Sequence, residues 1–125
     1  MLIQNEGGII EQNIYKFNNQ SGDIFGIREP YYSLVFSQDN LIFPNFIGGK
    51  EVKTILYGFE NLSNLINIDF NGILYIDGFT KCEKLTTVDF SGVEQIGWYA
   101  FSECPQLFSN NGICNFINSI AFIGM

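Results

Sequence analysis

Apolar residues recur in the same order twice in the central part of the chain. The first copy reads Leu65-x-x-Ile68-x-Phe70-x-Gly72-Ile73-x-x-Ile76, and the second, 20 residues later, reads Leu85-x-x-Val88-x-Phe90-x-Gly92-Val93-x-x-Ile96. The copies continue into matching tails, Phe79-x-x-Cys82-x-x-Leu85 and Phe101-x-x-Cys104-x-x-Leu107. A period in the low twenties is typical of a solenoid, whose turns bury their apolar faces by stacking on one another. The sequence therefore predicts a repeat solenoid that is mainly β.

Each repeat is expected to begin with a short strand. Ile68 and Phe70 alternate with polar residues in the first copy, and the second copy has the same alternation. This pattern is typical of a strand with one buried face. Gly72 follows the strand, and a residue without a Cβ lets the chain change direction sharply there. Strands of successive repeats should pair in parallel, about 4.7–4.9 Å apart.

The repeat divides the chain into two parts. Residues 1–40 alternate without a clean register and form either an N-terminal cap or degenerate repeats, whereas residues 41–125 form the solenoid. The predicted coils are 41–64, 65–84, 85–106 and a partial coil 107–125. The complete coils are 20–24 residues long. Their differences fall between the strand and the tail, where loops accept insertions at small cost.

The first and last coils match the pattern less closely than the two between them. In the first coil, the segment aligned with the strand is Leu41-x-x-Pro44-x-Phe46-x-Gly48. Phe46 thus takes the place of Phe70, extra residues follow Gly48, and Leu62 occupies the position of Cys82. In the last coil, the segment that echoes Val93-x-x-Ile96 is Ile117-x-x-Ile120.

Composition and charge narrow the possible partners. Hydrophobic residues make up 46% of the chain, and many of its 13 phenylalanines fall at repeat positions, so we expect an aromatic-rich core. The net charge of −7 and six scattered basic residues argue against nucleic-acid binding, which needs clustered lysines and arginines. No apolar run is long enough to predict a membrane span. The first residues lack the features of a signal peptide, which leaves a cytosolic protein, export by another route or a fragment as alternatives.

One segment closely resembles the signature of the BspA-like leucine-rich repeats. It reads Ile96-Gly-Trp-Tyr-Ala-Phe101-Ser-Glu-Cys104-Pro-Gln-Leu107. In that family, Ile-Gly-x-x-Ala-Phe-x-x-Cys-x-x-Leu precedes a Leu-x-x-Ile-x-Leu strand. The resemblance is strong over 85–107 and good over 52–84, although Ile76-Asp-Gly-Phe79 is shorter and lacks the alanine. It implies leucine-rich-repeat coils with a short parallel sheet on the concave face. It also implies a surface-exposed protein that binds host or matrix proteins, with no catalytic residues.

Four polar residues are candidates for contact with a partner. Asn67, Asp69, Thr87 and Asp89 occupy the outward positions of the two predicted strands and should form two columns on the concave face. Stacked carboxylates attract a cation or a basic segment of a partner protein. A solvated polar face is the simpler interpretation, because like charges about 5 Å apart in water repel by less than ~1 kcal/mol.

Trp98 and Tyr99 form a second candidate surface, in the loop before Phe101. An exposed aromatic pair is a common anchor of a protein interface. Trp98 equally suits a position that covers the edge of the coil, and the sequence leaves these alternatives open.

The cysteines and the composition argue against catalysis. Cys82 and Cys104 occupy the same repeat position, so adjacent coils bring them close enough for a disulfide. Leu62 at the equivalent position favours buried, reduced thiols instead. Three cysteines without histidine or Cys-x-x-Cys predict no metal site, and no cofactor motif is present. The absence of histidine also excludes Ser-His-Asp and Cys-His catalysis, so we predict that the protein is not an enzyme.

These observations lead to one function and two alternatives. We predict a non-catalytic leucine-rich-repeat module that binds a protein partner in adhesion at the cell surface, the location that the resemblance implies. The first alternative is an intracellular interaction scaffold in the cytoplasm. The second is a truncated repeat fragment without an independent function, whose uncapped C-terminal end would self-associate through exposed strand edges.

Overall fold

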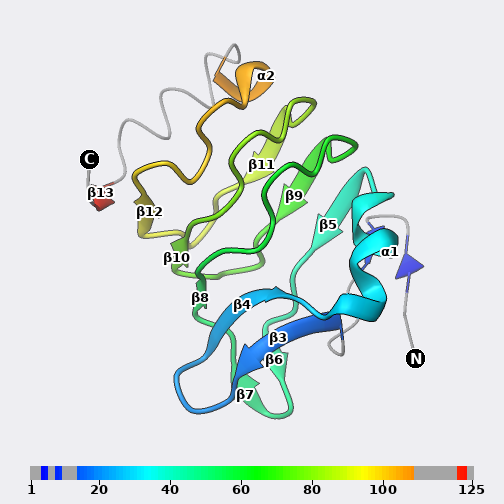
Figure 1. The fold of residues 1–125 in the computed structure, drawn as a ribbon. Helices are drawn as coiled ribbons and strands as arrows, with labels where there is room; N and C mark the ends of the chain where they lie inside the picture. The colour runs from blue at the N-terminus through cyan, green and yellow to red at the C-terminus, as the bar shows by residue number, and fades with distance from the viewer. Residues whose placement is uncertain (1–3, 6–7, 10–13, 109–120, 124–125) are drawn as a thin grey trace.

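The computed structural model describes residues 4–5, 8–9, 14–108 and 121–123 (Figure 1). The N-terminal strands are β1 (Gln4–Asn5), β2 (Gly8–Ile9), β3 (Tyr15–Asn18) and β4 (Asp23–Ile27). The 3-10 helix η2 (Glu29–Tyr31) and the helix α1 (Tyr32–Phe36) follow. The next strands are β5 (Asn40–Ile42), β6 (Phe46–Ile47), β7 (Lys50–Glu51), β8 (Thr54–Ile55), β9 (Asn67–Asp69), β10 (Tyr75–Ile76), β11 (Thr87–Asp89) and β12 (Gln95–Gly97). The short helix α2 (Pro105–Phe108) and the strand β13 (Ala121–Ile123) come last.

The first sheet, sheet A, has the strand order β1-β2-β5-β9-β11. Its neighbouring strands are parallel except for β1, which runs antiparallel to β2. Ile68 pairs with Val88 on one side and with Leu41 on the other, so equivalent positions of successive repeats lie side by side. The predicted parallel pairing of the two central repeat strands is therefore confirmed.

A second sheet, sheet B, joins the strands that follow the glycine turns, in the order β13-β12-β10-β8-β4-β3. Its strands are parallel except for β3, which pairs antiparallel with β4. Ile24, Ile55, Ile76 and Ile96 occupy one row across it, and all four side chains are buried. In Figure 1 the strands β5, β9 and β11 follow one another on one side of the interior, and β8, β10 and β12 on the other.

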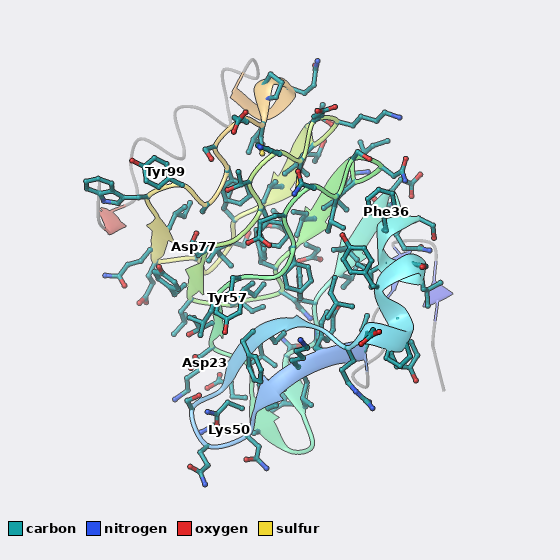
Figure 2. All side chains as sticks on the ribbon, in the orientation of Figure 1. Asp23, Phe36, Lys50, Tyr57, Asp77 and Tyr99 are labelled. Carbon is teal, nitrogen blue, oxygen red and sulfur yellow. The ribbon has the colours of Figure 1, made fainter. Side chains whose placement is uncertain are left out.

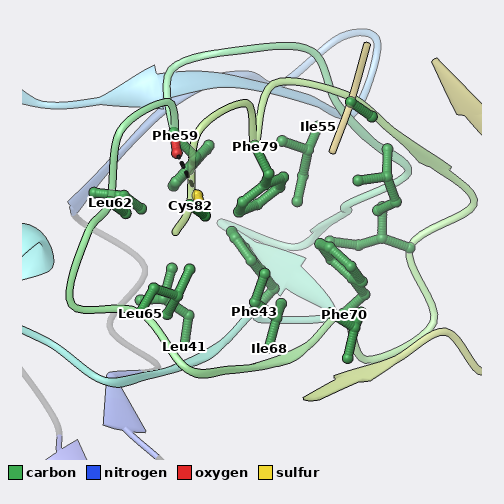
Figure 3. Packing of buried hydrophobic residues seen from close by; sticks show 14 of the residues in the cluster. Leu41, Phe43, Ile55, Phe59, Leu62, Leu65, Ile68, Phe70, Phe79 and Cys82 are labelled. Carbon is green, nitrogen blue, oxygen red and sulfur yellow. Dashed lines mark hydrogen bonds between the residues drawn. The ribbon is translucent and has the colours of Figure 1, made fainter. Parts of the chain in front are cut away.

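Two rows of aromatic rings fill the space between the sheets. Phe43, Phe70 and Phe90 follow the strands of sheet A, with ring centroids 5.7 and 6.0 Å apart. The second row comes from the repeat tails and consists of Phe59, Phe79 and Phe101, at 5.2 and 5.7 Å. The rows meet edge to face, as Figure 3 shows for its four labelled phenylalanines. Offset and edge-to-face pairs at these separations stabilise a core beyond the burial of their area.

Tyr15 closes the N-terminal end of this aromatic core. Its ring stacks on Phe43 at 5.5 Å and lies 6.1 Å from Phe59. The side chain is buried, and its hydroxyl has no hydrogen-bond partner among the described residues. Burial raises the pKa of this phenol far above its ordinary value. Tyr15 therefore serves as an additional ring in the core.

Positive φ angles mark the same two places in successive repeats. Gly72 and Gly92 have φ of 88° and 83°, which confirms the predicted change of direction after the strand. Asn61, Lys81 and Glu103 lie one residue before the Leu62, Cys82 and Cys104 positions, with φ of 63°, 63° and 57°. A non-glycine residue in this region costs roughly 1–2 kcal/mol. The backbone at this position also forms hydrogen bonds between repeats, for example from Asn61 N–H to Thr80 O at 2.9 Å.

The expected alignment of the first coil is wrong by three residues. Leu41, not Pro44, pairs with Ile68, so Phe43 takes the position of Phe70. Phe43 is fully buried, whereas Phe46 is 53% exposed in the β6–β7 hairpin. The physical reason is that this hairpin is inserted directly after the strand. The extra residues therefore begin at Phe46, before Gly48, and Phe46 belongs to the insertion.

Both ends of the chain extend the sheets. At the N-terminal end, β2 and β4 pair in parallel with β5 and β8, while β1 and β3 add an antiparallel strand to each sheet. Residues 1–40 thus contain a further turn of repeat-like pairing together with antiparallel edge strands. At the C-terminal end, Phe122 pairs with Ile96. The partners predicted from sequence, Ile117 and Ile120, lie outside the described residues.

Truncation of a central ring should destabilise the fold far more than truncation of an exposed one. Phe79 is fully buried and contacts rings of both rows, so Phe79→Ala should lower the free energy of unfolding by about 3–5 kcal/mol. Tyr57 is mostly exposed, and Tyr57→Ala should cost less than about 1 kcal/mol. Urea unfolding of both variants measures the difference. Equal losses would show that the aromatic rows do not carry the stability of the core.

Candidate partner-binding surfaces

The four polar candidates lie together on the outward face of sheet A. Ile68 and Val88 are buried, whereas the residues on either side of each are half-buried or exposed. Asn67 pairs with Thr87, and Asp69 pairs with Asp89. Strand β5 extends the first column with Asn40 and the second with Ile42. The structure therefore brings the four predicted residues into two adjacent columns.

Both aspartates also have a structural role that the sequence analysis missed. The Oδ1 atom of Asp69 accepts a hydrogen bond from Asn71 N–H at 2.9 Å, and that of Asp89 accepts one from Ser91 N–H at 2.9 Å. These are Asx turns, in which a side chain closes the turn that begins after its own strand. The signal was available as Asp-Phe-Asn-Gly and Asp-Phe-Ser-Gly, because an aspartate two residues before a polar turn residue commonly does this.

Asn71 connects the turns of neighbouring repeats. Its Nδ2 donates to Phe43 O at 2.9 Å and to Asn45 Oδ1 at 3.0 Å. Asn45 Nδ2 donates in return to Asn71 O at 2.7 Å. The residues that follow the strands of sheet A are therefore held by side chains as well as by the strand pairing.

Asp89 remains negatively charged at neutral pH. Hydrogen bonds from the Ser91 side chain, and secondly from its backbone N–H, hold the pKa of Asp89 below its ordinary value. Because the side chain is exposed, the carboxylate is available to solvent while it closes the turn. The Asp89 carboxylate can therefore accept hydrogen bonds from a partner as a negatively charged group that the turn holds in place.

The second candidate surface lies at the loops that follow the strands of sheet B. We call the loops 56–60, 77–80 and 97–102 the aromatic rim. Trp98 and Tyr99 are 41% and 66% exposed, with ring centroids 6.0 Å apart. Tyr57, which the sequence analysis did not select, is 54% exposed in the equivalent loop. Figure 2 shows Tyr57, Asp77 and Tyr99 one after another along this border of the molecule. Trp98 therefore presents much of its ring to solvent.

Asp77 lies on the same rim and is fixed by two hydrogen bonds. Its Oδ1 accepts from Gly78 N–H at 2.8 Å, and its Oδ2 accepts from the Tyr75 hydroxyl at 3.3 Å. Burial, and secondly the nearby Asp77 carboxylate, raise the pKa of Tyr75 above its ordinary value. Tyr75 therefore stays protonated and acts as a hydrogen-bond donor to Asp77.

Cys82 and Cys104 are buried free thiols at equivalent repeat positions. The Cys82 Sγ–H donates to Phe59 O at 3.5 Å, as Figure 3 shows, and the Cys104 Sγ–H donates to Phe79 O at 3.2 Å. The expectation of buried thiols is confirmed. The neighbouring Cys104 side chain, and secondly burial, raise the pKa of Cys82. Among the described residues, no cluster of histidine, cysteine and carboxylate side chains could hold a metal ion.

Comparison with known proteins returns no relative. No model of a protein family matches the chain, and neither does any curated protein or solved structure. The resemblance to BspA-like repeats therefore rests on the motifs of residues 52–107. Among the described residues, none of the helices has the length and apolar character needed to cross a membrane.

The lowered pKa of Asp89 makes a prediction about stability and pH. A carboxyl whose pKa is lower in the folded state contributes stability above its unfolded pKa and loses it as pH falls through its folded pKa. At pH 6, Asp89→Asn should therefore be less stable than wild type, by less than about 1 kcal/mol at this exposed site. The difference should disappear near about pH 2. Urea unfolding at both pH values measures it, and a pH-independent difference would contradict it.

The buried thiols make a prediction about reactivity. In native protein, Cys82 and Cys104 should react slowly with a thiol reagent such as DTNB, because both side chains are buried and out of reach of the reagent. At Cys82 a raised pKa also leaves little thiolate. After unfolding in urea without reductant, both should react fully. A Cys114→Ser background restricts the signal to these two residues. Rapid reaction in the native state, or no reaction after unfolding, would be inconsistent with buried free thiols.

Proposed function

We propose that the protein is a non-catalytic binding module, a leucine-rich-repeat solenoid of the BspA-like kind. The outward face of sheet A is its surface for a protein partner. One observation carries this proposal: polar side chains of successive repeats form two columns on a face whose alternate residues are buried. In leucine-rich repeats the concave sheet is the usual binding surface, and the resemblance implies that sheet A is its counterpart.

The face is well suited to binding because its groups are held in place before a partner arrives. The Asx turns fix Asp69 and Asp89, and the Asn45–Asn71 hydrogen bonds tie neighbouring turns together. A preorganised surface loses less conformational entropy on association than a mobile one. Asp69 and Asp89 favour a partner that presents lysine or arginine side chains, because charge-assisted hydrogen bonds are the strongest that such a face can offer.

The chemistry of the face also supports binding rather than catalysis. Asn67 and Thr87 are neutral groups that donate and accept hydrogen bonds, and Asp89 has a lowered pKa. A catalytic carboxyl that transfers protons near neutral pH usually has a raised pKa instead. The two aspartates therefore suit recognition of a partner by charge.

An intracellular scaffold is the second candidate for the same face. The buried free thiols Cys82 and Cys104 favour it, since neighbouring cysteines in an oxidising compartment commonly form disulfides. Protease shaving of intact source cells separates the two candidates. Release of peptides from 52–107 without lysis favours the adhesion-type protein, whereas release only after lysis favours the scaffold.

The partner surface can be tested with charge-neutral variants that keep the turns intact. Asparagine retains the Oδ1 acceptor of the Asx turn, so Asp69→Asn with Asp89→Asn should change the melting temperature little. Against a panel of purified extracellular-matrix proteins, measured by surface plasmon resonance, this variant should lose at least about tenfold in affinity for any ligand that wild type binds. A tenfold loss is about 1.4 kcal/mol, shared by two carboxylates.

The matched control removes the same charge elsewhere. Glu83 and Glu103 are exposed carboxylates in the repeat tails, outside the strands of sheet A. Glu83→Gln with Glu103→Gln should leave the affinity unchanged. A wild-type affinity in the aspartate variant, or an equal loss in both variants, would exclude the face of sheet A as the binding site.

A further inference from the structure

The aromatic rim consists of loops that are held against one another by backbone hydrogen bonds. Phe59 N–H donates to Gly78 O at 3.2 Å, and Phe79 N–H donates to Ala100 O at 2.7 Å. Thr80 Oγ1 adds a bond to Tyr99 O at 2.7 Å. The loops therefore form one continuous border, so the exposed rings of Tyr57, Trp98 and Tyr99 belong to a single surface.

Two carboxylates, those of Glu60 and Asp77, lie in these loops. A Cβ on Gly78 would lie 2.5 Å from Tyr57 Cα and 3.2 Å from a carboxylate oxygen of Glu60. Gly78 N–H also donates to Asp77 Oδ1. Tyr57, Glu60 and Asp77 therefore converge on Gly78, where the absence of a side chain lets them approach.

On its other side, the Asp77 carboxylate lies against the next loop. A Cβ on Gly97 would clash with Asp77 Oδ2 and would lie 2.9 Å from the Tyr75 hydroxyl. Trp98 follows Gly97 directly in the chain. The carboxylate of Asp77 is thus located between the loop of Tyr57 and the loop that carries Trp98 and Tyr99.

The charge of the rim is of one sign. The loops 56–60, 77–80 and 97–102 contain Glu60 and Asp77 but no lysine or arginine. Isolated exposed rings are ordinary on protein surfaces and by themselves indicate no ligand. Here three exposed rings share loops with two carboxylates, and these loops contain no basic residue. The face of an aromatic ring attracts a cation, and so does a carboxylate.

We propose that the aromatic rim binds an arginine-bearing segment of a partner protein. The guanidinium lies over the rings and donates hydrogen bonds to Asp77 or Glu60. Arginine fits better than lysine, because its planar group stacks on a ring while its N–H fork reaches a carboxylate. This surface is separate from the face of sheet A and does not depend on the function proposed for that face.

Trp98 supplies a direct readout, since it is the only tryptophan of the chain. The probe is a hexa-arginine peptide with acetylated and amidated ends, titrated into the protein at moderate salt. We expect a saturable change in Trp98 fluorescence and protection of Trp98 from acrylamide quenching. The same peptide built from citrulline, which has nearly the same shape without the charge, should produce neither effect.

Variants distinguish stacking on the rings from general attraction to an acidic protein. Tyr57→Leu and Tyr99→Leu keep an apolar side chain but remove the ring, so each should weaken binding about two- to fivefold. Tyr57→Phe keeps the ring and should bind as wild type does. Asp77→Asn should also weaken binding. Phe46→Leu removes an equally exposed ring in the β6–β7 hairpin and should have no effect.

Three outcomes would overturn the proposal, provided that thermal unfolding shows the variants to be folded. These are equal binding of the citrulline peptide, wild-type affinity in both leucine variants, and loss of binding in the Asp69→Asn and Asp89→Asn variant. The last outcome would place the peptide on sheet A. It would support the function proposed above while excluding the rim.

Discussion

The structure depends on the contact between two rows of phenylalanine rings. One row follows the strands of sheet A, and the other comes from the repeat tails, with Phe43, Phe70 and Phe79 near the centre. A single repeat cannot bury its rings, because each ring needs neighbours from the repeats before and after it. The rings therefore couple the repeats to one another, and the parallel pairing of both sheets keeps them in register. Tyr15 extends the same contact to the N-terminal segment.

Both candidate surfaces follow from this inner arrangement. Once Ile68 and Val88 are buried, the residues beside them must face outward, so the columns of sheet A result from burial on the other face. The aromatic rim arises differently. Its loops vary in length between Ile55, Ile76 or Ile96 and the next buried phenylalanine, and this variation lets exposed rings and carboxylates gather there.

The roles of individual polar residues could be predicted only in part. The alternation placed Asp69 and Asp89 correctly on the outward face, because a two-residue period follows directly from strand geometry. Their Asx turns were missed, although the local motif contained the signal. Tyr57 could not be selected from sequence, because exposure and burial of an aromatic residue in a loop depend on how the next repeat packs against it.

The sequence by itself determined the period, the buried positions of the two central repeats, the glycine turns and the burial of Cys82 and Cys104. Each of these follows from spacing within a short stretch of chain, which the hydrophobic pattern records. Tertiary structure alone decided the register of the first coil, where the inserted β6–β7 hairpin moved the buried ring from Phe46 to Phe43. It also decided that residues before 40 extend both sheets. Those pairings join segments separated in the chain by other strands and helices. Local spacing carries no information about which distant backbone groups will meet.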